Sequence, residues 1–461
     1  MRDIIFTAAF LGMLPAALRF GHVGTMLWAW VAMIAPNQYL YGFARGLPFN
    51  KIVVAVAVLA LVLDRARRPK FYADTHVKLL LFFLAIGLAS YFLGITDTRR
   101  GDDLADRLAK AVALCLFVVA TVRERLHIHS LLLAICMGMA IHGAIEAAKF
   151  VASGGGHVLQ GPATIGDNNH FGLAILMVIP PLAYLVRYSA APLVRVALGL
   201  ALAGNVVGVI ASNSRGALIG LIAMGGAMFL RSRNKLRTMI VIIILGGIGL
   251  TIAPDRWFDR MSTISSAETD GSFMGRVASW KMNLLVALDR PLLGGGFSAM
   301  EDFNAWSIYL REFSALDFIR TGMPTRPLAA HSIYFQVLGD TGFIGFALFV
   351  GLLYLGFRNV RVIARLTKDR PDLEWARDVG RFMRFTLIAY AVSGAALSLA
   401  YFEFYYLVLT LISVTRRNVE MAVGKPVGAG LAMLQAASGP RPGFAPGMAR
   451  DGRAEPLPTP R

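Results

Sequence analysis

Three side chains in this sequence have the type and setting to bind or deprotonate a substrate. Arg215 lies in a Ser-Asn-Ser-Arg-Gly turn between two apolar runs, and the turn is too short to leave a membrane surface. Arg276 lies in a stretch with helical spacing, and His331 precedes the apolar segment that begins at Ser332. Guanidinium groups bind phosphate oxygens bidentately. The start of a helix attracts anions and favours a neutral imidazole, which can act as a base.

Each of the three residues also has a simpler interpretation. Arg215 has the character of an anchor that reaches lipid headgroups, Arg276 that of a solvated side chain, and His331 that of a capping or packing histidine. Anchoring arginines are usually cytoplasmic, however, and Arg215 is expected on the outward side. Its position therefore favours anion binding more strongly than that of Arg276 or His331.

A second group of polar residues follows a glycine-rich outward loop. Asp167, Asn168 and Asn169 stand directly before an apolar run, where Asp167 or Asn168 would cap the helix and the cluster could equally recognise sugar hydroxyls. Ser214 adds a small polar group beside Arg215. Asp102 and its neighbour have no second ligand cluster, so we predict that the protein binds no metal.

These residues must be positioned by membrane-spanning helices. Of the 461 residues, 56% are hydrophobic and 16% are charged, whereas soluble domains carry about 25% charged residues. The apolar residues fall in blocks long enough to cross a bilayer. The composition predicts an all-α polytopic membrane protein with about 12 to 13 transmembrane helices, the first of them retained rather than cleaved as a signal peptide. The expected spans are 4–18, 21–36, 51–63, 78–94, 108–122, 129–150, 170–186, 193–212, 214–230, 238–253, 331–357, 383–400 and 401–415.

The net charge of +18 indicates topology rather than nucleic-acid binding. Stretches after alternate spans contain 27 basic and nine acidic residues, so they hold the whole excess charge. By the positive-inside rule these stretches are cytoplasmic. They are 64–70, 123–125, 187–195, 231–237, 358–384 and 416–461. The outward loops are then 37–50, 95–107, 151–169, the turn at Arg215, and 254–330. Both cysteines, Cys115 and Cys136, lie in apolar runs, which excludes a disulfide scaffold.

The loop lengths divide the chain into four parts. Residues 1–253 form an N-terminal transmembrane bundle, 254–330 a large periplasmic loop, 331–415 the C-terminal transmembrane helices, and 416–461 a disordered cytoplasmic tail. Within the third part, 358–384 has the pattern of an amphipathic segment that lies on the inner leaflet.

The large loop contains one clear helical pattern, Ser272–Leu288. Its apolar residues recur at a spacing of three to four, and three polar residues occupy another face. The apolar positions are Phe273, Val277, Trp280, Leu284 and Leu288; the polar ones are Arg276, Ser279 and Asn283.

Polar residues inside the spans favour a different class of protein. A permease or lipid flippase would place its function at mid-span residues such as His142, Glu146 and Glu403. Glu146 precedes Lys149 by three residues, which predicts a local ion pair. Glu403 stands among aromatic residues that have the pattern of an interfacial belt, which places it at the water boundary.

The order of these motifs resembles the bacterial O-antigen ligase/polymerase superfamily of polytopic glycosyltransferases. The resemblance covers about residues 1–415. More narrowly, the start of the chain and three motifs are similar to the O-glycosylation ligases associated with exosortase systems. The motifs behind both resemblances are Met1-Arg2-Asp3, Gly166-Asp167-Asn168-Asn169, Ser214-Arg215-Gly216-Ala217, Gly275-Arg276 with Trp280, Pro291-Leu292-Leu293-Gly294-Gly295-Gly296 and His331-Ser332-Ile333-Tyr334.

The resemblance implies a GT-C-like enzyme of the inner membrane. It would transfer a glycan from a polyprenyl-diphosphate carrier, such as undecaprenyl diphosphate, to a hydroxyl acceptor on the periplasmic face. The acceptor is a protein Ser/Thr, a lipid-linked core or, in a polymerase, another lipid-linked repeat of a polysaccharide. The family is metal-independent, inverting and without a cofactor, and its two arginines and one histidine match Arg215, Arg276 and His331. The family often has His-Asn where this chain has His331-Ser332, which leaves the role of the second residue open.

The chemistry of that reaction suits the residues. Negative charge develops on the diphosphate as the bond to the sugar breaks, and two guanidiniums stabilise it without a metal. His331 then has two possible roles: it takes the proton of the acceptor as a general base, or it binds the diphosphate. Asp167, Asn168, Asn169 and Ser214 are the expected additional substrate-binding residues, and membrane lipids are the expected surroundings.

Overall fold

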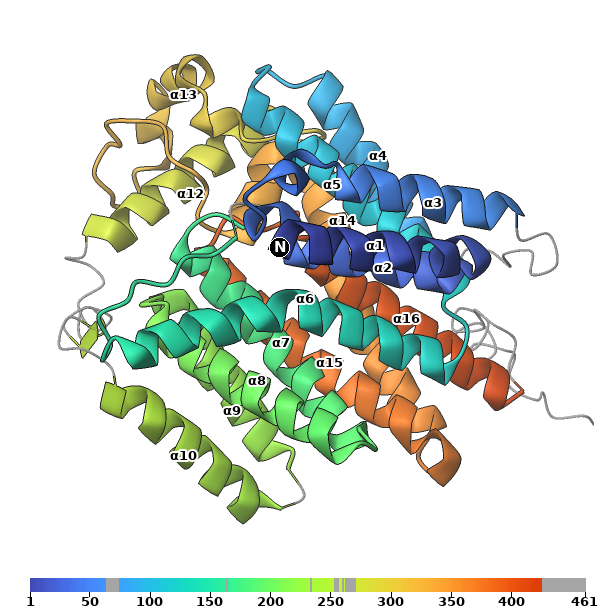
Figure 1. Ribbon diagram of the computed structural model, residues 1–461. Coiled ribbons are helices and arrows are strands. Elements are labelled where there is room, and N and C mark those ends of the chain that lie inside the picture. Colours follow the sequence, from blue (N-terminus) through green and yellow to red (C-terminus); the bar gives the residue numbers. More distant parts are fainter. Residues whose placement is uncertain are drawn as a thin grey trace, which may run out of the picture.

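The computed structural model describes residues 1–63, 74–162, 165–232, 234–252, 257–258, 261 and 271–424. All secondary structure in these ranges is helical, and most helices lie side by side in one bundle (Figure 1). The α-helices are α1 (Arg2–Arg19), α2 (Gly21–Ile34), α3 (Phe49–Leu63), α4 (Thr75–Phe92), α5 (Arg99–Thr121), α6 (Arg125–Ala152), α7 (Asn168–Tyr188), α8 (Pro192–Ala211), α9 (Arg215–Leu230), α10 (Lys235–Ile252), α12 (Gly271–Asp289), α13 (Phe303–Leu310), α14 (Ile333–Leu366), α15 (Glu374–Ser393) and α16 (Glu403–Ala422). Short 3-10 turns are η1 (Pro36–Gln38), η2 (Phe43–Gly46), η4 (Ala299–Glu301), η5 (Phe313–Leu316), η6 (Pro371–Leu373) and η7 (Gly394–Ala396).

The described helices confirm the predicted fold class. Five of them, α4, α6, α7, α8 and α14, are long and apolar enough to cross a membrane, and α3 and α9 are shorter apolar helices. The protein is an all-helical polytopic membrane protein. The total of 12 to 13 spans stays a prediction. The tail predicted at 416–461 begins too early, because residues up to Ala422 belong to α16 and pack against the bundle; the part beyond residue 424 lies outside the described residues.

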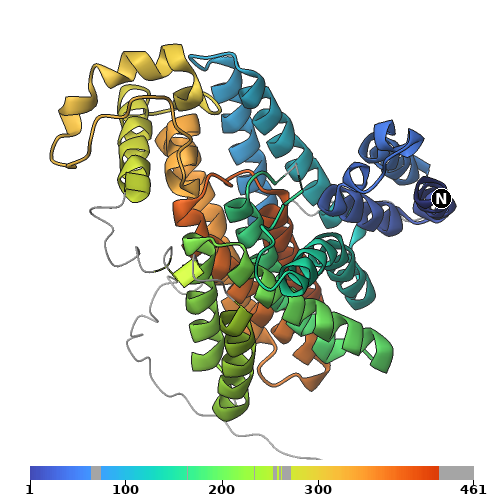
Figure 2. The same cartoon turned by 60° about the vertical axis from the view of Figure 1, so that its left-hand side comes forward.

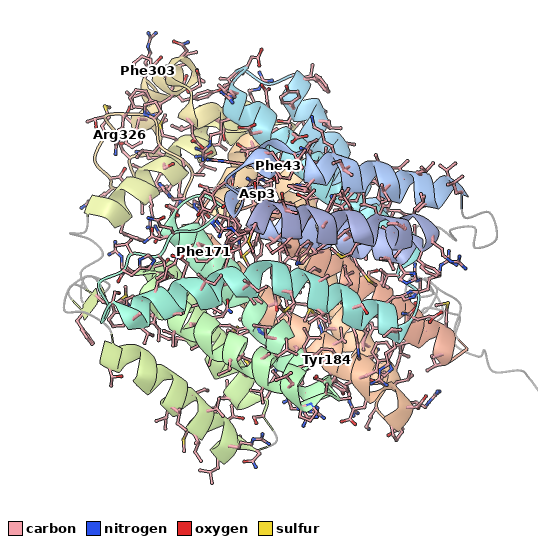
Figure 3. The ribbon with its side chains drawn as sticks, viewed as in Figure 1. Asp3, Phe43, Phe171, Tyr184, Phe303 and Arg326 are labelled. Carbon is pink, nitrogen blue, oxygen red and sulfur yellow. The ribbon has the colours of Figure 1, made fainter. Side chains whose placement is uncertain are left out.

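Helix α7 lies at the centre of the bundle, between α6, α8 and α15 (Figure 1). Every residue from Phe171 to Leu182 is buried. A helix that is apolar all round is stable only when it is enclosed on every side. Phe171 and Tyr184 mark its two ends (Figure 3). The first turn of α7 therefore holds a fixed position at one end of the bundle.

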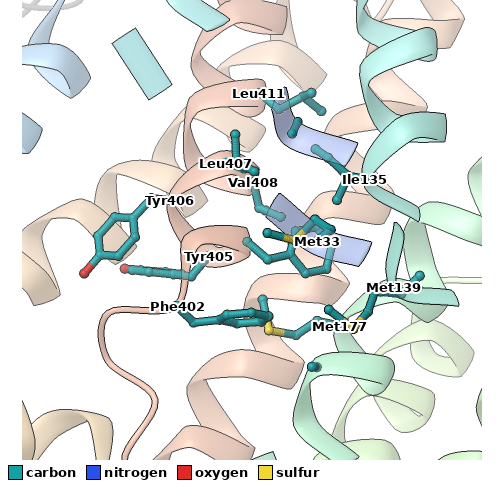
Figure 4. Packing of buried hydrophobic residues seen from close by; sticks show 14 of the residues in the cluster. Met33, Ile135, Met139, Met177, Phe402, Tyr405, Tyr406, Leu407, Val408 and Leu411 are labelled. Carbon is teal, nitrogen blue, oxygen red and sulfur yellow. The ribbon is translucent and has the colours of Figure 1, made fainter. Parts of the chain in front are cut away.

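The aromatic residues around Glu403 do not form an interfacial belt. Tyr401, Phe402, Tyr405 and Tyr406 are each at most 2% exposed, and they pack with methionine and leucine side chains in the main core (Figure 4). The prediction was wrong because the apolar content of a helix does not say whether lipid or protein covers it. Glu403 starts α16 and lies 3.8 Å from Arg107.

Residues 358–384 also differ from the prediction of a separate amphipathic segment on the membrane surface. They form the last turns of α14, a short turn with η6, and the first turns of α15. Their apolar side chains Ile363, Trp375 and Val379 are buried in the protein core. The amphipathic pattern thus reflects helix ends with one face against the bundle.

The helix predicted at Ser272–Leu288 is confirmed as α12, but its buried face is not the predicted one. Ser279 and Asn283 are buried, whereas Leu288 is 54% exposed. Met282 and Val286 pack with α13, η4 and η5 around a second, smaller core. Figure 2 shows α12 and α13 projecting beyond the bundle, away from α1 to α3.

The three consecutive glycines after α12 pair with the backbone of α14. Gly295 donates to the carbonyl of Gly339 and Gly296 to that of Asp340, at 2.9 and 3.1 Å. Gly342, with φ +66°, kinks α14 at this point. We call this contact the glycine junction (residues 294–296 with 339–342). Only glycine permits it, because a Cβ at Gly294 would lie 2.5 Å from the Gly339 oxygen.

We expect Gly294→Ala to destabilise the fold. Its φ of +65° costs a side-chain-bearing residue about 1–2 kcal/mol, and the clash adds to that. Thermal unfolding in detergent, followed by tryptophan fluorescence, should give a lower Tm. Gly322→Ala is the control, because nothing lies within 4 Å of its Cβ position. Equal melting temperatures for the two variants would contradict this account of the junction.

Candidate active site

His331 is held in a strained position directly before α14. Ser332 caps the helix by accepting from the N–H of Tyr334, and His331 has a left-handed φ of +47°. Its backbone N–H donates to Ser398 Oγ at 2.6 Å. Left-handed backbone costs free energy for any residue with a Cβ, so this conformation persists only because its surroundings impose it. The predicted position at a helix N-terminus is confirmed.

Helix α12 brings Arg276 towards the same place. Ser279, one helical turn after Arg276, donates to the carbonyl of Ala329 at 2.7 Å. Trp280 stacks on Phe335, with ring centroids 5.3 Å apart and an angle of 5° between the planes. These contacts tie α12 to the chain on both sides of His331.

The charges around His331 act on its imidazole. Burial lowers its pKa from the ordinary value of 6.5, and the positive charge of Arg276 lowers it further; His170 and Arg100 act in the same direction, and Asp167 opposes them. The imidazole is therefore neutral at neutral pH, as predicted. The same interactions place Arg276, His170, Asp167 and Arg100 within electrostatic reach of His331.

Asp167 caps α7, as predicted. Its Oδ1 accepts from the N–H groups of Asn169 and His170, and it also lies 2.8 Å from Nδ1 of the His170 ring. Burial raises the pKa of Asp167, but the bonds from the side chain and backbone of His170 outweigh burial and hold it below the ordinary value. Asp167 is therefore a carboxylate at neutral pH.

The turn that contains Arg215 packs against α7. Asn168 donates to the carbonyl of Ser212 at 2.8 Å, and Ser214 caps α9 by accepting from the N–H of Ala217. Arg215 is the first residue of α9. A Cβ atom at the next residue, Gly216, would lie 3.6 Å from Ala396 of η7. The loop after η7 contains Ser398, which accepts the hydrogen bond from the backbone of His331. Arg215 and His331 are thus both fixed by residues 393–398.

Two further charged residues of this region were not predicted from the sequence. Arg100, in the first turn of α5, forms an ion pair with Glu301 of η4 at 3.0 Å. Burial raises the pKa of Glu301, while Arg100, Ser298 and His170 lower it. His170 itself was also missed. Its signal was its place directly after the Asp-Asn-Asn cluster; Arg100 and Glu301 are 201 residues apart and gave no signal.

Asp340 is a fourth residue of this region that was not predicted from the sequence. It is 3% exposed, and its carboxylate accepts from the N–H of Ser298 and the hydroxyl of Tyr401, both at 2.9 Å. Its carbonyl accepts from Ser90 and Gly296. An acidic residue inside a transmembrane helix is costly and usually functional, and that signal was present in the sequence. Asp340 joins α4, α14, the segment before α16 that carries Tyr401, and the segment that leads to Glu301.

The mid-span residues that a permease would use are engaged in local contacts. Glu146 pairs with Lys149 at 2.6 Å, as predicted, and with His157 at 2.8 Å. His142 contacts the hydroxyl of Tyr39 and lies 3.0 Å from the carbonyl of Ile34. Within the described ranges, no three His, Cys, Asp or Glu side chains gather as they would around a metal ion.

Comparison with known families covers most of the chain. Residues 198–350 match the O-antigen ligase family, and residues 1–189 match a family of unknown function (DUF5935). The chain carries an O-antigen ligase domain. The protein is therefore an enzyme, a glycosyltransferase. No curated protein matches the chain. The ligase domain contains Arg215, Arg276 and His331, whereas Asp167 and His170 belong to the other matched part.

We expect Arg276→Gln to raise the pKa of His331. Removing a nearby cation makes protonation of the imidazole easier. The shift is measurable by NMR titration of the ring carbons in protein with labelled histidine, with the His331 signal assigned by its loss in His331→Gln. Arg320→Gln, at an exposed arginine of the same segment, should leave the titration unchanged. An unchanged His331 titration in Arg276→Gln would show that the two side chains are not close.

Proposed function

We propose that the protein transfers a glycan from a polyprenyl-diphosphate carrier to a hydroxyl acceptor at the periplasmic face of the bacterial inner membrane. An O-antigen ligase domain implies a lipid-linked donor and an acceptor. The main support is the convergence of Arg276, Arg100, His331 and the Asp167–His170 pair at one end of the bundle. We call this the α12 end (residues 93–100, 153–162, 165–170, 212–216, 271–332 and 393–402).

The charge distribution supports a periplasmic α12 end. At the opposite end, Arg381 donates to the carbonyl of Arg231, and Arg187 pairs with Glu374 at 3.1 Å. These contacts join three of the basic stretches, 187–195, 231–237 and 358–384, at that end. Positively charged loops remain on the cytoplasmic side, so the α12 end faces the periplasm.

The proposed reaction needs positive charge where the carrier leaves. As the bond between the sugar and the diphosphate breaks, its electron pair remains on the diphosphate oxygen. Arg215 and Arg276 bind these oxygens and stabilise the developing charge. An acceptor that attacks from the opposite side of the anomeric carbon inverts its configuration.

The surroundings of His331 favour the second of its two possible roles. The cations that disfavour a protonated His331 stabilise an anion at the same place. Its neutral imidazole can donate one N–H to a diphosphate oxygen without the cost of burying a further charge. We therefore assign His331 to the diphosphate.

The polar residues near α7 contribute unequally to sugar binding. The Asn168 amide donates to Ser212, and the Ser214 hydroxyl accepts from Ala217, so both mainly shape the site. The Asn169 amide makes only long contacts, at 3.4 and 3.5 Å. Asn169 is therefore the residue that we assign to the sugar hydroxyls, with Asp167 holding the helix start.

Replacement of Arg215 or Arg276 by alanine should lower turnover about 10²–10³-fold, the usual loss when a group that stabilises a developing oxyanion is removed. The measurement is release of free polyprenyl diphosphate by purified protein in nanodiscs. The donor is the mixture of lipid-linked glycans extracted from the cells in which the protein naturally occurs. The acceptors, tested separately, are a Ser/Thr peptide, a lipid-linked core and a second lipid-linked glycan.

Arg320→Ala is the matched control and should retain wild-type turnover. The accepted substrate distinguishes a ligase from a polymerase, because only a polymerase extends the second lipid-linked glycan. Full activity of both Arg215→Ala and Arg276→Ala would refute the assignment of the site. Absence of any product from the wild-type protein with all three acceptors would refute the transfer reaction.

Turnover should be unaffected by EDTA. The arginines supply the positive charge that a divalent ion would otherwise provide. The assay above, repeated after dialysis against EDTA and again after addition of Mg²⁺, Mn²⁺ or Ca²⁺, checks this. Activity that disappears with EDTA and returns with one of these ions would contradict a metal-independent reaction.

A further inference from the structure

The Asp167–His170 pair has the arrangement of a carboxylate–imidazole dyad. Asp167 Oδ1 lies 2.8 Å from Nδ1 of His170. Both ring nitrogens of His170 are buried, and neither makes an aligned hydrogen bond with a described residue: Nδ1 meets Asp167 through this short ion-pair contact, and Nε2 has no partner. When a carboxylate holds the proton on Nδ1, the lone pair is on Nε2, and that nitrogen becomes the base. A buried nitrogen without a partner is destabilising, and a bound hydroxyl group would satisfy it.

The dyad is firmly positioned relative to the ligase domain. Asp167 caps α7, and Asn168 is bonded to Ser212 in the Arg215 turn. Gly172 of α7 has close neighbours in the same turn: a Cβ atom there would lie 2.7 Å from Ser212 Oγ and 3.1 Å from Ala217 Cβ. The start of α7 is therefore packed directly against the start of α9.

The charged groups that face His170 come from several elements. Asp167 lies on its own helix start, His331 precedes α14, and Glu301 belongs to η4. Arg276 of α12 and Arg100 of α5 act on the same His331. His170 thus shares its surroundings with the acidic Asp167 and Glu301 and with the cationic Arg276 and Arg100 near His331.

We propose that His170, oriented by Asp167, is the base that accepts the proton of the acceptor hydroxyl. This inference rests on the proposed glycan transfer. The acceptor oxygen forms a bond to the anomeric carbon, and the bond from that carbon to the diphosphate oxygen breaks with its electron pair. The acceptor proton moves to Nε2 of His170, and the carboxylate of Asp167 stabilises the imidazolium until the proton passes to water.

The two imidazoles of the site then have different tasks. A base is helped by an adjacent carboxylate, which His170 has and which is the arrangement known from serine hydrolases. His331 is surrounded by arginines, which disfavour its protonated form. His170 therefore suits the acceptor, and His331 suits the departing carrier.

Two isosteric variants test this proposal. His170→Gln should lower turnover at least 10²-fold, the lower range for loss of a general base. Asp167→Asn retains a good helix cap, because asparagine caps as well as aspartate, but it removes the charge that orients the ring. It should lower turnover by a comparable factor. Binding of undecaprenyl diphosphate, the expected product carrier, should change less than twofold in both variants.

The pH dependence gives a readout that a merely structural role would not produce. The acidic limb of the pH–rate profile should be displaced in Asp167→Asn, because the carboxylate beside the proposed base is absent. The same limb should remain in place in Arg320→Ala. His157→Gln is the matched histidine control, since His157 also pairs with a carboxylate, Glu146 at 2.8 Å, and it should retain turnover.

The outcomes separate this proposal from the proposed function. Full turnover in His170→Gln, with turnover lost and undecaprenyl diphosphate binding retained in His331→Gln, would make His331 the base and overturn the inference alone. Loss of undecaprenyl diphosphate binding in His170→Gln would also overturn it, because His170 would then hold the carrier. A wild-type protein that neither binds undecaprenyl diphosphate nor transfers glycan would refute the proposed function itself.

Discussion

The buried carboxylate of Asp340 is the contact on which the α12 end depends. It accepts from Ser298 and Tyr401, while the backbone beside it pairs with Gly295 and Gly296. These bonds attach the segment that follows α12 to the first half of α14, the helix that starts after His331. Together with the stacking of Trp280 on Phe335 and the bond from Ser279 to Ala329, they hold α12 against α14. A buried carboxylate is tolerated only when donors satisfy it, so the same bonds that stabilise Asp340 also fix the site.

The positively charged side chains of the site are gathered around His331 at the α12 end. Arg276 and Arg100 lie within electrostatic reach of His331, near the boundary between protein and water. Charge interactions are stronger in such partly desolvated places than in bulk water. The negative charge of a lipid diphosphate would be neutralised by these arginines, so no cation from solvent is needed. The helix starts of α7, α9 and α14 add the positive ends of their dipoles in the same region.

Several predictions failed for one shared reason. The aromatic residues 401–406 and the apolar residues of 358–384 have the composition of membrane-facing segments, yet the structure buries them in protein. On α12 the polar Ser279 is buried because it bonds to a carbonyl from a distant segment, and the apolar Leu288 is exposed. Hydropathy measures the preference of a side chain for an apolar environment, but it does not identify whether lipid or protein provides that environment.

The sequence by itself determined the fold class, the helical character of most segments, the start of a helix at Asp167 or Asn168 and the position of His331 at a helix start. These depend on local composition, periodicity and capping, which act within a few residues along the chain. Only the tertiary structure decided that α12 turns Arg276 towards His331, that Arg100 meets Glu301, and that Asp340 receives bonds from three other segments. Those contacts join residues up to hundreds of positions apart, and their energies depend on burial and geometry that exist only in the packed bundle.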